Sequence, residues 1–203
     1  MTGTSNRVRQ TPRRFLALIL AASALLGQGC VWYRFVSVPA YRSVSITGSA
    51  ATGGPQATVI GLTQAADMKL YLDLVINGRP VRGVVDTGAY PTFFDKGALE
   101  EIGVRVDRTR TPAETNGGVL YTGVLSSLKI GGMEFKDFTC WSLDLSKERS
   151  LHARNGLPDF AVLLGADVLT RFRARIDVGK RELVLTLPEG MLRSDPAKAA
   201  TSP

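Results

Sequence analysis

Histidine and cysteine are scarce in this sequence. Its 203 residues contain one histidine, His152, and two cysteines. Two cysteines cannot form a disulfide scaffold, and neither lies in a CxxC pair or a Cys/His cluster of the kind that binds zinc. A single histidine also gives little support for a Ser-His-Asp catalytic triad. The composition therefore argues against a disulfide-rich protein, a zinc protein and a serine hydrolase, and we expect no metal site.

Runs of arginine are absent as well, although the formal net charge is +7 at pH 7. The first 29 residues contain four arginines and no acidic residue, so a mature chain beginning at Cys30 would carry 21 basic and 18 acidic residues. The other basic residues are scattered, without the interleaved aromatic residues that stack on bases. We therefore expect no nucleic-acid binding.

The apolar runs are too short to anchor the chain stably across a bilayer. The run from Phe15 to Leu26 has twelve residues and follows a polar, basic segment, which is typical of a signal peptide. Residues 30–66 then divide into two parts. Residues 31–46 could pair as an extra strand or lie near a membrane surface, whereas Thr47 to Ala57 has the small-residue composition of a flexible tether.

The segment Gly27-Gln28-Gly29-Cys30 resembles the lipobox of bacterial lipoproteins, in which small residues precede a cysteine that is acylated and begins the mature chain. The resemblance implies a lipoprotein-like signal peptide at residues 1–29, lipidation at Cys30 and membrane attachment through the N-terminal lipid. Val31, in place of an acidic residue, implies the periplasmic face of the bacterial outer membrane. The alternatives are an ordinary cleaved signal, leaving a soluble periplasmic protein, or an uncleaved anchor, with Cys30 incidental in both.

From Asp67 onward the pattern is that of an all-β domain, which we place at residues 67–190, before a disordered tail at residues 191–203. Leu70 to Ile76 alternates in hydrophobicity, Asn77-Gly78 is a strong hairpin signal, and Val81 to Val85 returns as the second strand. Later strands are expected over Ser126 to Ile130, Met133 to Trp141, Ala161 to Leu164, Ala174 to Val178 and Glu182 to Leu187.

One or two short helices interrupt the strands. The first is expected over Asp95 to Ile102, with Asp95 as its N-cap and Gly103 as its stop, and the second over Asp167 to Phe172.

The strand ending at Val85 leads into Asp86-Thr87-Gly88-Ala89, which by itself is also ordinary turn chemistry. About 75 residues later, Val162 to Leu169 runs from an apolar strand through Gly165 into the second helix. Together these segments resemble the retropepsin-like aspartic proteases, in particular their bacterial, often exported, members. The resemblance implies a closed acid-protease β-barrel half, with Asp86 catalytic and Thr87, Gly88 and Ala89 supporting the active-site loop.

Peptide hydrolysis by carboxyl groups requires two of them and no cofactor. One activates water and the other protonates the leaving amide, and two close carboxyls share one proton because both cannot ionise cheaply. The sequence contains one Asp-Thr-Gly segment. The nearest candidate for a second catalytic loop is Asp177-Val178-Gly179, in which valine replaces the hydroxyl residue. There Gly179-Lys180 favours a hairpin turn. One half-site per chain implies a homodimer in which two Asp86 carboxyls meet on the two-fold axis.

By the same resemblance, Pro112 to Gly123 would form a flap with Asn116-Gly117-Gly118 at its tip, although a plain surface turn is nearly as good an interpretation. Tyr90 and Tyr121 could line the substrate cleft or be packed aromatics. His152 and Arg149 lie in a charged stretch that we expect to be solvated, and Cys140 is expected to be a small buried hydrophobe.

The sequence thus predicts an aspartic endopeptidase that acts on a protein or peptide of the cell envelope. The alternative is a catalytically silent lipoprotein of the same fold that serves as a binding or scaffold module.

Overall fold

The computed structural model describes residues 40–47, 56–109 and 119–188, all within one compact unit, Ser37–Pro203. The expected signal peptide, Cys30, the flap tip Asn116-Gly117-Gly118 and the C-terminal tail lie outside the described residues. In the part of the chain that the structure describes, no helix is long and apolar enough to cross a membrane.

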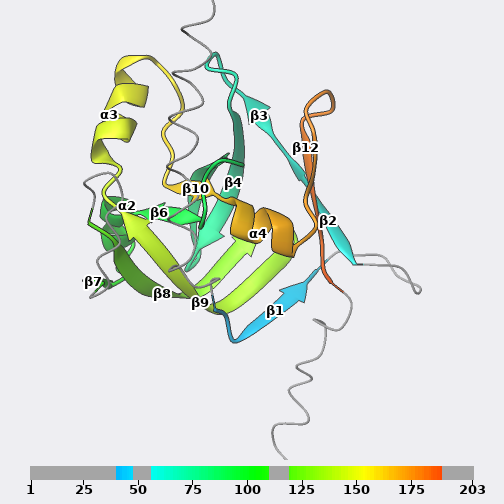
Figure 1. Ribbon diagram of the computed structural model, residues 1–203, viewed down its shortest axis with the longest axis horizontal. Coiled ribbons are helices and arrows are strands. Elements are labelled where there is room, and N and C mark those ends of the chain that lie inside the picture. The colour runs from blue at the N-terminus through cyan, green and yellow to red at the C-terminus, as the bar shows by residue number, and fades with distance from the viewer. Residues whose placement is uncertain (1–39, 48–55, 110–118, 189–203) are drawn as a thin grey trace, which may run out of the picture. The chain divides into compact units, whose positions relative to one another are not determined.

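A ring of six strands forms the body of the protein (Figure 1). The strands follow one another in the order β9-β6-β10-β5-β4-β8, and β8 pairs with β9 to close the ring. Their bounds are β4 Leu70–Ile76, β5 Arg79–Val85, β6 Phe93–Asp95, β8 Tyr121–Ile130, β9 Met133–Leu143 and β10 Val162–Leu164. The expected all-β class, a closed barrel with short helices, is confirmed.

Further strands extend this body. In the same sheet, β1 (Ser43–Ile46), β3 (Thr63–Gln64) and β7 (Val106–Arg108) pair with β9, β4 and β8, respectively. A separate three-stranded sheet has the order β11-β12-β2, with β11 Arg175–Asp177, β12 Glu182–Thr186 and β2 Ala57–Gly61. Paired strands thus begin upstream of residue 67, because β1 and β2 find partners more than 80 residues later in the chain.

The first hairpin shows why local sequence predicts part of this fold. Asn77 and Gly78 have φ of 50° and 82°, the left-handed conformation that a two-residue turn between right-twisted strands requires. In the following strands the side chains alternate: Val162, Leu164 and Phe94 are fully buried in the barrel core, and their neighbours Leu163 and Phe93 are only partly buried.

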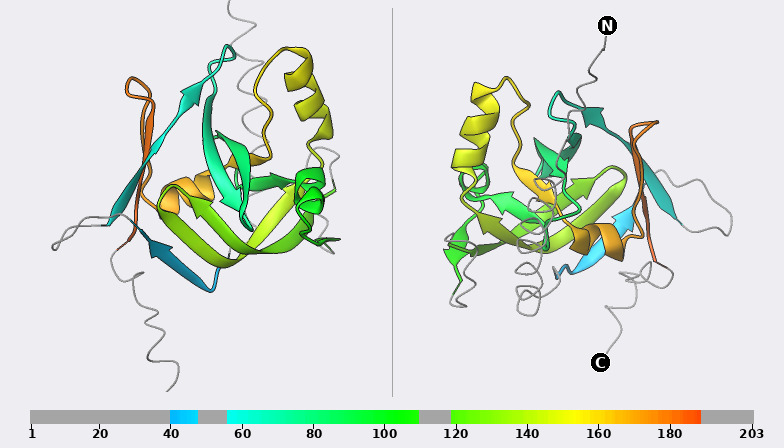
Figure 2. Two further views of the ribbon diagram at one scale, coloured as in Figure 1. Left: turned by 180° about the vertical axis from the view of Figure 1, so that it is seen from behind. Right: turned by 45° about the horizontal axis from the view of Figure 1, so that its top comes forward.

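Three short helices complete the described structure. The expected helices are confirmed as α2 (Lys96–Glu101) and α4 (Ala166–Arg171). Asp95 caps α2 by accepting a hydrogen bond from the Ala98 amide, and Gly103 follows it with φ of 78°. The third helix, α3 (Ser146–Arg154), was not predicted, since its sequence was interpreted as a charged loop. Figure 2 shows α3 on one side of the barrel and the β11–β12 hairpin on another.

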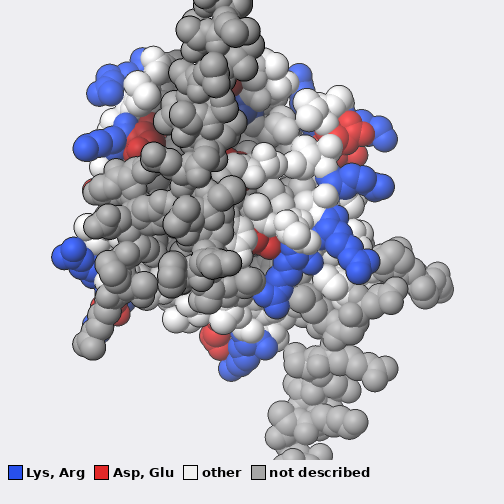
Figure 3. Space-filling view, in the orientation of Figure 1, with Lys and Arg blue, Asp and Glu red and all other residues white. Residues whose placement is uncertain are grey.

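Arg149 corrects the expectation that the charged residues of this stretch form a solvated face. Its Nη1 donates to Asp95 Oδ2 at 2.6 Å, and its Nε and Nη2 donate to the two carboxylate oxygens of Asp159 at 2.9 and 2.6 Å. Asp95 is only 2% exposed. Elsewhere, the Lys and Arg side chains visible in Figure 3 are scattered over the face, several beside acidic residues, which agrees with their scattered positions in the sequence.

We expect Arg149→Met to lower the free energy of unfolding by about 3 kcal/mol, because it leaves the buried Asp95 carboxylate without its cation. The Arg149 hydrogen bonds also hold the pKa of Asp159 below its ordinary value. A lowered carboxyl pKa contributes stability that is present above the ordinary value and is lost as pH falls through the folded value. The variant should therefore lose less stability than the wild type on acidification below about pH 4.

Urea unfolding at a series of pH values measures both effects. The double variant Asp95→Asn, Arg149→Met is the matched control, because an asparagine can still cap α2 without leaving a buried charge. It should regain part of the lost stability; no recovery would show that Arg149 acts through its packing and not through Asp95.

Candidate active site

The Asp-Thr-Gly-Ala loop begins where β5 ends. The Asp86 amide donates to the Leu164 carbonyl at 3.0 Å, so the backbone ladder between β5 and β10 continues into the loop. Asp86 Oδ1 accepts hydrogen bonds from the Gly88 and Ala89 amides at 3.0 and 3.2 Å. The loop's own backbone therefore fixes the orientation of the carboxylate.

The alternation of β5 places Asp86 outside the barrel. Val85 packs against the main core, whereas Val84 belongs to a second apolar cluster with Tyr71, Leu145 and Phe160. Side chains two residues apart share a face of a strand, so Asp86 continues the face of Val84. Asp86 is partly exposed and Thr87 is exposed, which leaves the carboxylate accessible to water and to another molecule.

The segment from β10 to α4 supports this loop. Strand β10 pairs in parallel with β5, with Leu164 opposite Val85. Beyond it, the Ala166 amide donates to the Ala89 carbonyl at 2.8 Å. A Cβ on Gly165 would lie 2.8 Å from the Ala89 carbonyl oxygen and from the carbonyl carbon and oxygen of Pro91. Only glycine therefore fits where the two segments cross.

A buried hydrogen-bond network joins the same two segments. Asp167, 4% exposed, accepts at Oδ1 from the Thr92 amide, the Thr92 hydroxyl and the Val168 amide, at 2.9, 2.7 and 2.7 Å. Thr92 Oγ1 in turn accepts from the Gly165 amide at 2.9 Å. Asp167 has no role assigned from the sequence; the signal that could have indicated one is a carboxylate between two apolar pairs, Leu163-Leu164 and Val168-Leu169.

With this geometry established, residues 72–168 match the family described as aspartyl protease. The matched range contains both Asp86 and Asp167. Over this range the chain is similar to aspartyl proteases.

Relatives of this retropepsin-like domain include longer eukaryotic proteins. The chain is 31% identical over 116 residues to DNA damage-inducible protein 1 of Neurospora crassa, and 27% identical over 132 residues to Protein DDI1 homolog 2 of Mus musculus. The matches cover 57% and 61% of this chain, but 25% and 31% of the relatives. The chain thus spans less than a third of the length of these curated relatives.

Two solved structures are similar to the retropepsin-like domain. One is a retropepsin-like aspartic protease from Rickettsia conorii, with 25% identity and a TM-score of 0.43, covering 71% of this chain and 93% of that one. The other is the retroviral protease-like domain of Ddi1 from Leishmania major, with 21% identity and a TM-score of 0.41, covering 60% of this chain and 96% of that one.

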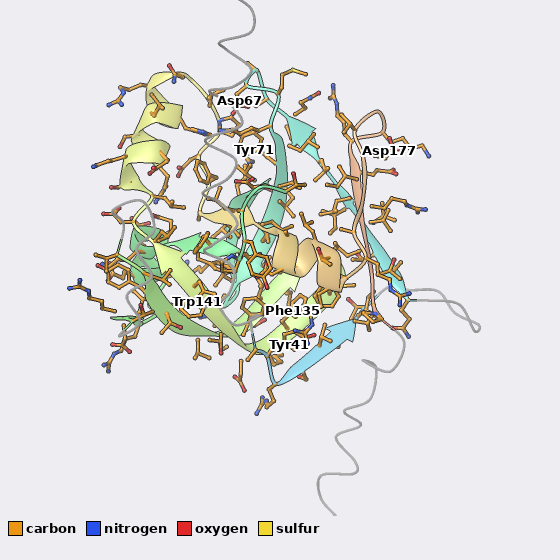
Figure 4. The ribbon with its side chains drawn as sticks, in the orientation of Figure 1. Tyr41, Asp67, Tyr71, Phe135, Trp141 and Asp177 are labelled. Carbon is orange, nitrogen blue, oxygen red and sulfur yellow. The ribbon has the colours of Figure 1, made fainter. Side chains whose placement is uncertain are left out.

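The remaining candidate residues of the retropepsin-like domain take different places. Tyr90 follows the active-site loop directly and is partly buried. Tyr121 is partly buried at the start of β8, where the Lys96 ammonium lies 5.4 Å from its ring centre. Asp177 lies at the end of β11, where its Oδ1 accepts from the Lys180 amide at 2.9 Å, so it stabilises a hairpin turn (Figure 4).

Two further residues carry reactive groups. Cys140 is fully buried in the core, and this burial raises the pKa of its thiol to about 12, as suits a small hydrophobe. His152 corrects the sequence-based expectation, because it is 5% exposed and not solvated. Among the residues that the structure describes, no group of three or more His, Cys, Asp or Glu side chains is arranged to hold a metal ion.

Proposed function

We propose that this chain is an aspartic endopeptidase that hydrolyses peptide bonds of an envelope protein or peptide. The observation that carries the proposal is the accessible Asp86 carboxylate, oriented by the Gly88 and Ala89 amides at the end of a buried strand. A binding module would gain nothing from such a carboxylate, whereas a hydrolase needs it rigid and reachable by water.

The proposed reaction uses two Asp86 carboxyls that share one proton. The ionised carboxyl takes a proton from water while the water oxygen attacks the scissile carbonyl carbon. The protonated carboxyl then donates its proton to the amide nitrogen, the C–N bond breaks, and the pair again holds one proton. Because the shared proton must be present, activity should be highest at acidic to neutral pH.

The second carboxyl is proposed to come from an identical chain. The sequence contains one Asp-Thr-Gly, and Thr87 and Gly88 are exposed beside Asp86. A two-fold axis through this loop would bring the two Asp86 side chains together and would allow Thr87 of each chain to contact the other loop. We further propose that lipidation of Cys30 tethers the dimer to the periplasmic face of an outer membrane.

The decisive experiment incubates the chain from Cys30 onward with a denatured protein mixture between about pH 4 and about pH 8. New peptide termini, identified by mass spectrometry, should appear with the wild type and be missing with Asp86→Asn. Identical termini with both would show a contaminating protease. No new termini at any pH would refute the hydrolase and favour a binding or scaffold module.

A further inference from the structure

Helix α3 docks on the barrel in an unusual way. Its nine residues include one buried side chain, His152, whereas its leucine, Leu151, is 51% exposed. A surface helix ordinarily buries an apolar stripe. Here an imidazole occupies the position that a leucine or phenylalanine would normally take, so the protonation state of one ring bears directly on docking.

The contacts of His152 require the neutral ring. Its Nε2 lies 3.1 Å from the Lys69 ammonium and its Nδ1 lies 3.2 Å from the Pro158 carbonyl oxygen. An ammonium only donates and a carbonyl only accepts, so Nε2 must accept and Nδ1 must carry the proton. The ring also packs between Phe160 and Tyr71, with centroid distances of 4.7 and 6.5 Å.

Protonation would disrupt this arrangement. It would turn Nε2 into a donor facing another donor and place a second positive charge 3.1 Å from Lys69 Nζ. A buried imidazolium without a compensating acceptor is costly, and the flanking aromatic rings offset only part of that cost.

The acidic groups nearby already have partners. Asp67 Oδ2 lies 3.4 Å from Lys69 Nζ and accepts from the Tyr71 hydroxyl at 3.0 Å (Figure 4). Asp159 accepts two hydrogen bonds from Arg149, which are the largest cause of its lowered pKa. A charged His152 would therefore compete for these carboxylates with Lys69 and Arg149.

Helix α3 is linked to the strand before the Asp86 loop through Tyr71 of β4. Tyr71, which contacts His152, is paired with Val84 across β4 and β5, and Val84 precedes Asp86 by two residues. Phe160 joins the same apolar cluster, against which Leu163 of β10 packs. Movement of α3 would thus expose Tyr71 and Phe160, which belong to the apolar cluster that contains Val84.

We propose that His152 is a pH-sensitive latch, which holds α3 against Tyr71 of β4 and against Phe160 while neutral and releases the helix when protonated. This inference follows from the contacts of α3 and does not depend on peptide hydrolysis.

Hydrogen exchange by mass spectrometry on the full-length chain tests it, with rates corrected for intrinsic pH dependence. Protection of α3 and of residues 155–160 in the wild type should fall at least about tenfold between about pH 7.5 and about pH 5, while β8 and β9 stay protected. Equal protection of α3 at both pH values would overturn the proposal.

Two variants distinguish the effect of protonating His152 from the effect of its packing. His152→Gln keeps a neutral acceptor and donor, and His152→Phe keeps a ring without a titratable group; in either one, protection of α3 should be the same at both pH values. A variant that is uniformly less protected, but not pH-dependent, still supports the latch. A pH-dependent loss in both variants equal to that of the wild type would assign the effect to another group.

Discussion

Asp86→Asn will slow peptide cleavage at least about a thousandfold and leave the fold intact. An amide can neither take a proton from water nor return one to the leaving nitrogen. Its oxygen can still accept from the Gly88 and Ala89 amides, so the loop keeps its shape. Steady-state kinetics on a cleaved peptide, with thermal unfolding alongside, measure the two effects separately.

Asp177→Asn is the matched control, because it makes the same change in the other Asp-X-Gly segment. Asp177 caps a hairpin turn, so this variant should keep wild-type activity. An inactive Asp177→Asn together with an active Asp86→Asn would move the catalytic role to the hairpin.

The same variant tests the homodimer. A ninefold molar excess of the Asp86→Asn chain, allowed to exchange subunits, should reduce wild-type activity to about a tenth, because most wild-type chains then lie in mixed dimers. Undiminished activity after exchange, or a monomeric mass for the active species, would contradict a site shared between two chains.

Gly165→Ala should cost both stability and activity. The added Cβ would lie 2.8 Å from three backbone atoms of Ala89 and Pro91, and no side-chain rotation can relieve a clash with backbone. Either β10 or the active-site loop must shift, which we expect to lower the free energy of unfolding by about 3 kcal/mol or more. The shift would also break the bond from the Ala166 amide to the Ala89 carbonyl.

Gly61→Ala is the control for this prediction. A Cβ there would meet no atom within 4 Å, so its stability and activity should match those of the wild type. Urea unfolding and peptide cleavage by both variants complete the comparison. Wild-type behaviour of Gly165→Ala would mean that the two segments do not cross as closely as described.

Local signals predicted the parts of the fold that neighbouring residues determine. Asn77-Gly78 specifies its turn through backbone conformation, and Asp95 caps α2 through an amide three residues away. The orientation of the Asp86 carboxylate belongs to this class too, since it is set by amides two and three residues later. Such features need no knowledge of distant partners.

Misinterpreted residues depend on partners far along the chain. Arg149 looks like a surface charge until Asp95, 54 residues earlier, is placed beside it. His152 lies in a polar helix and packs against Tyr71, which lies 81 residues earlier in the chain. A hydropathy pattern contains no information about which distant strand a helix will meet, so these contacts could not be predicted from one sequence.

Because β5 pairs in parallel with β10, the Asp86 loop depends on residues that are made much later than Asp86 during synthesis. Val84 and Leu163 are partners, and the hydrogen bonds that support Ala89 and Thr92 come from residues 165–167. A growing chain that already includes Asp86 therefore lacks residues 165–167, which support the Asp86 loop, until almost the whole barrel has been made. The Asp86 loop can therefore reach its supported form only late in synthesis, after the chain has passed residue 167.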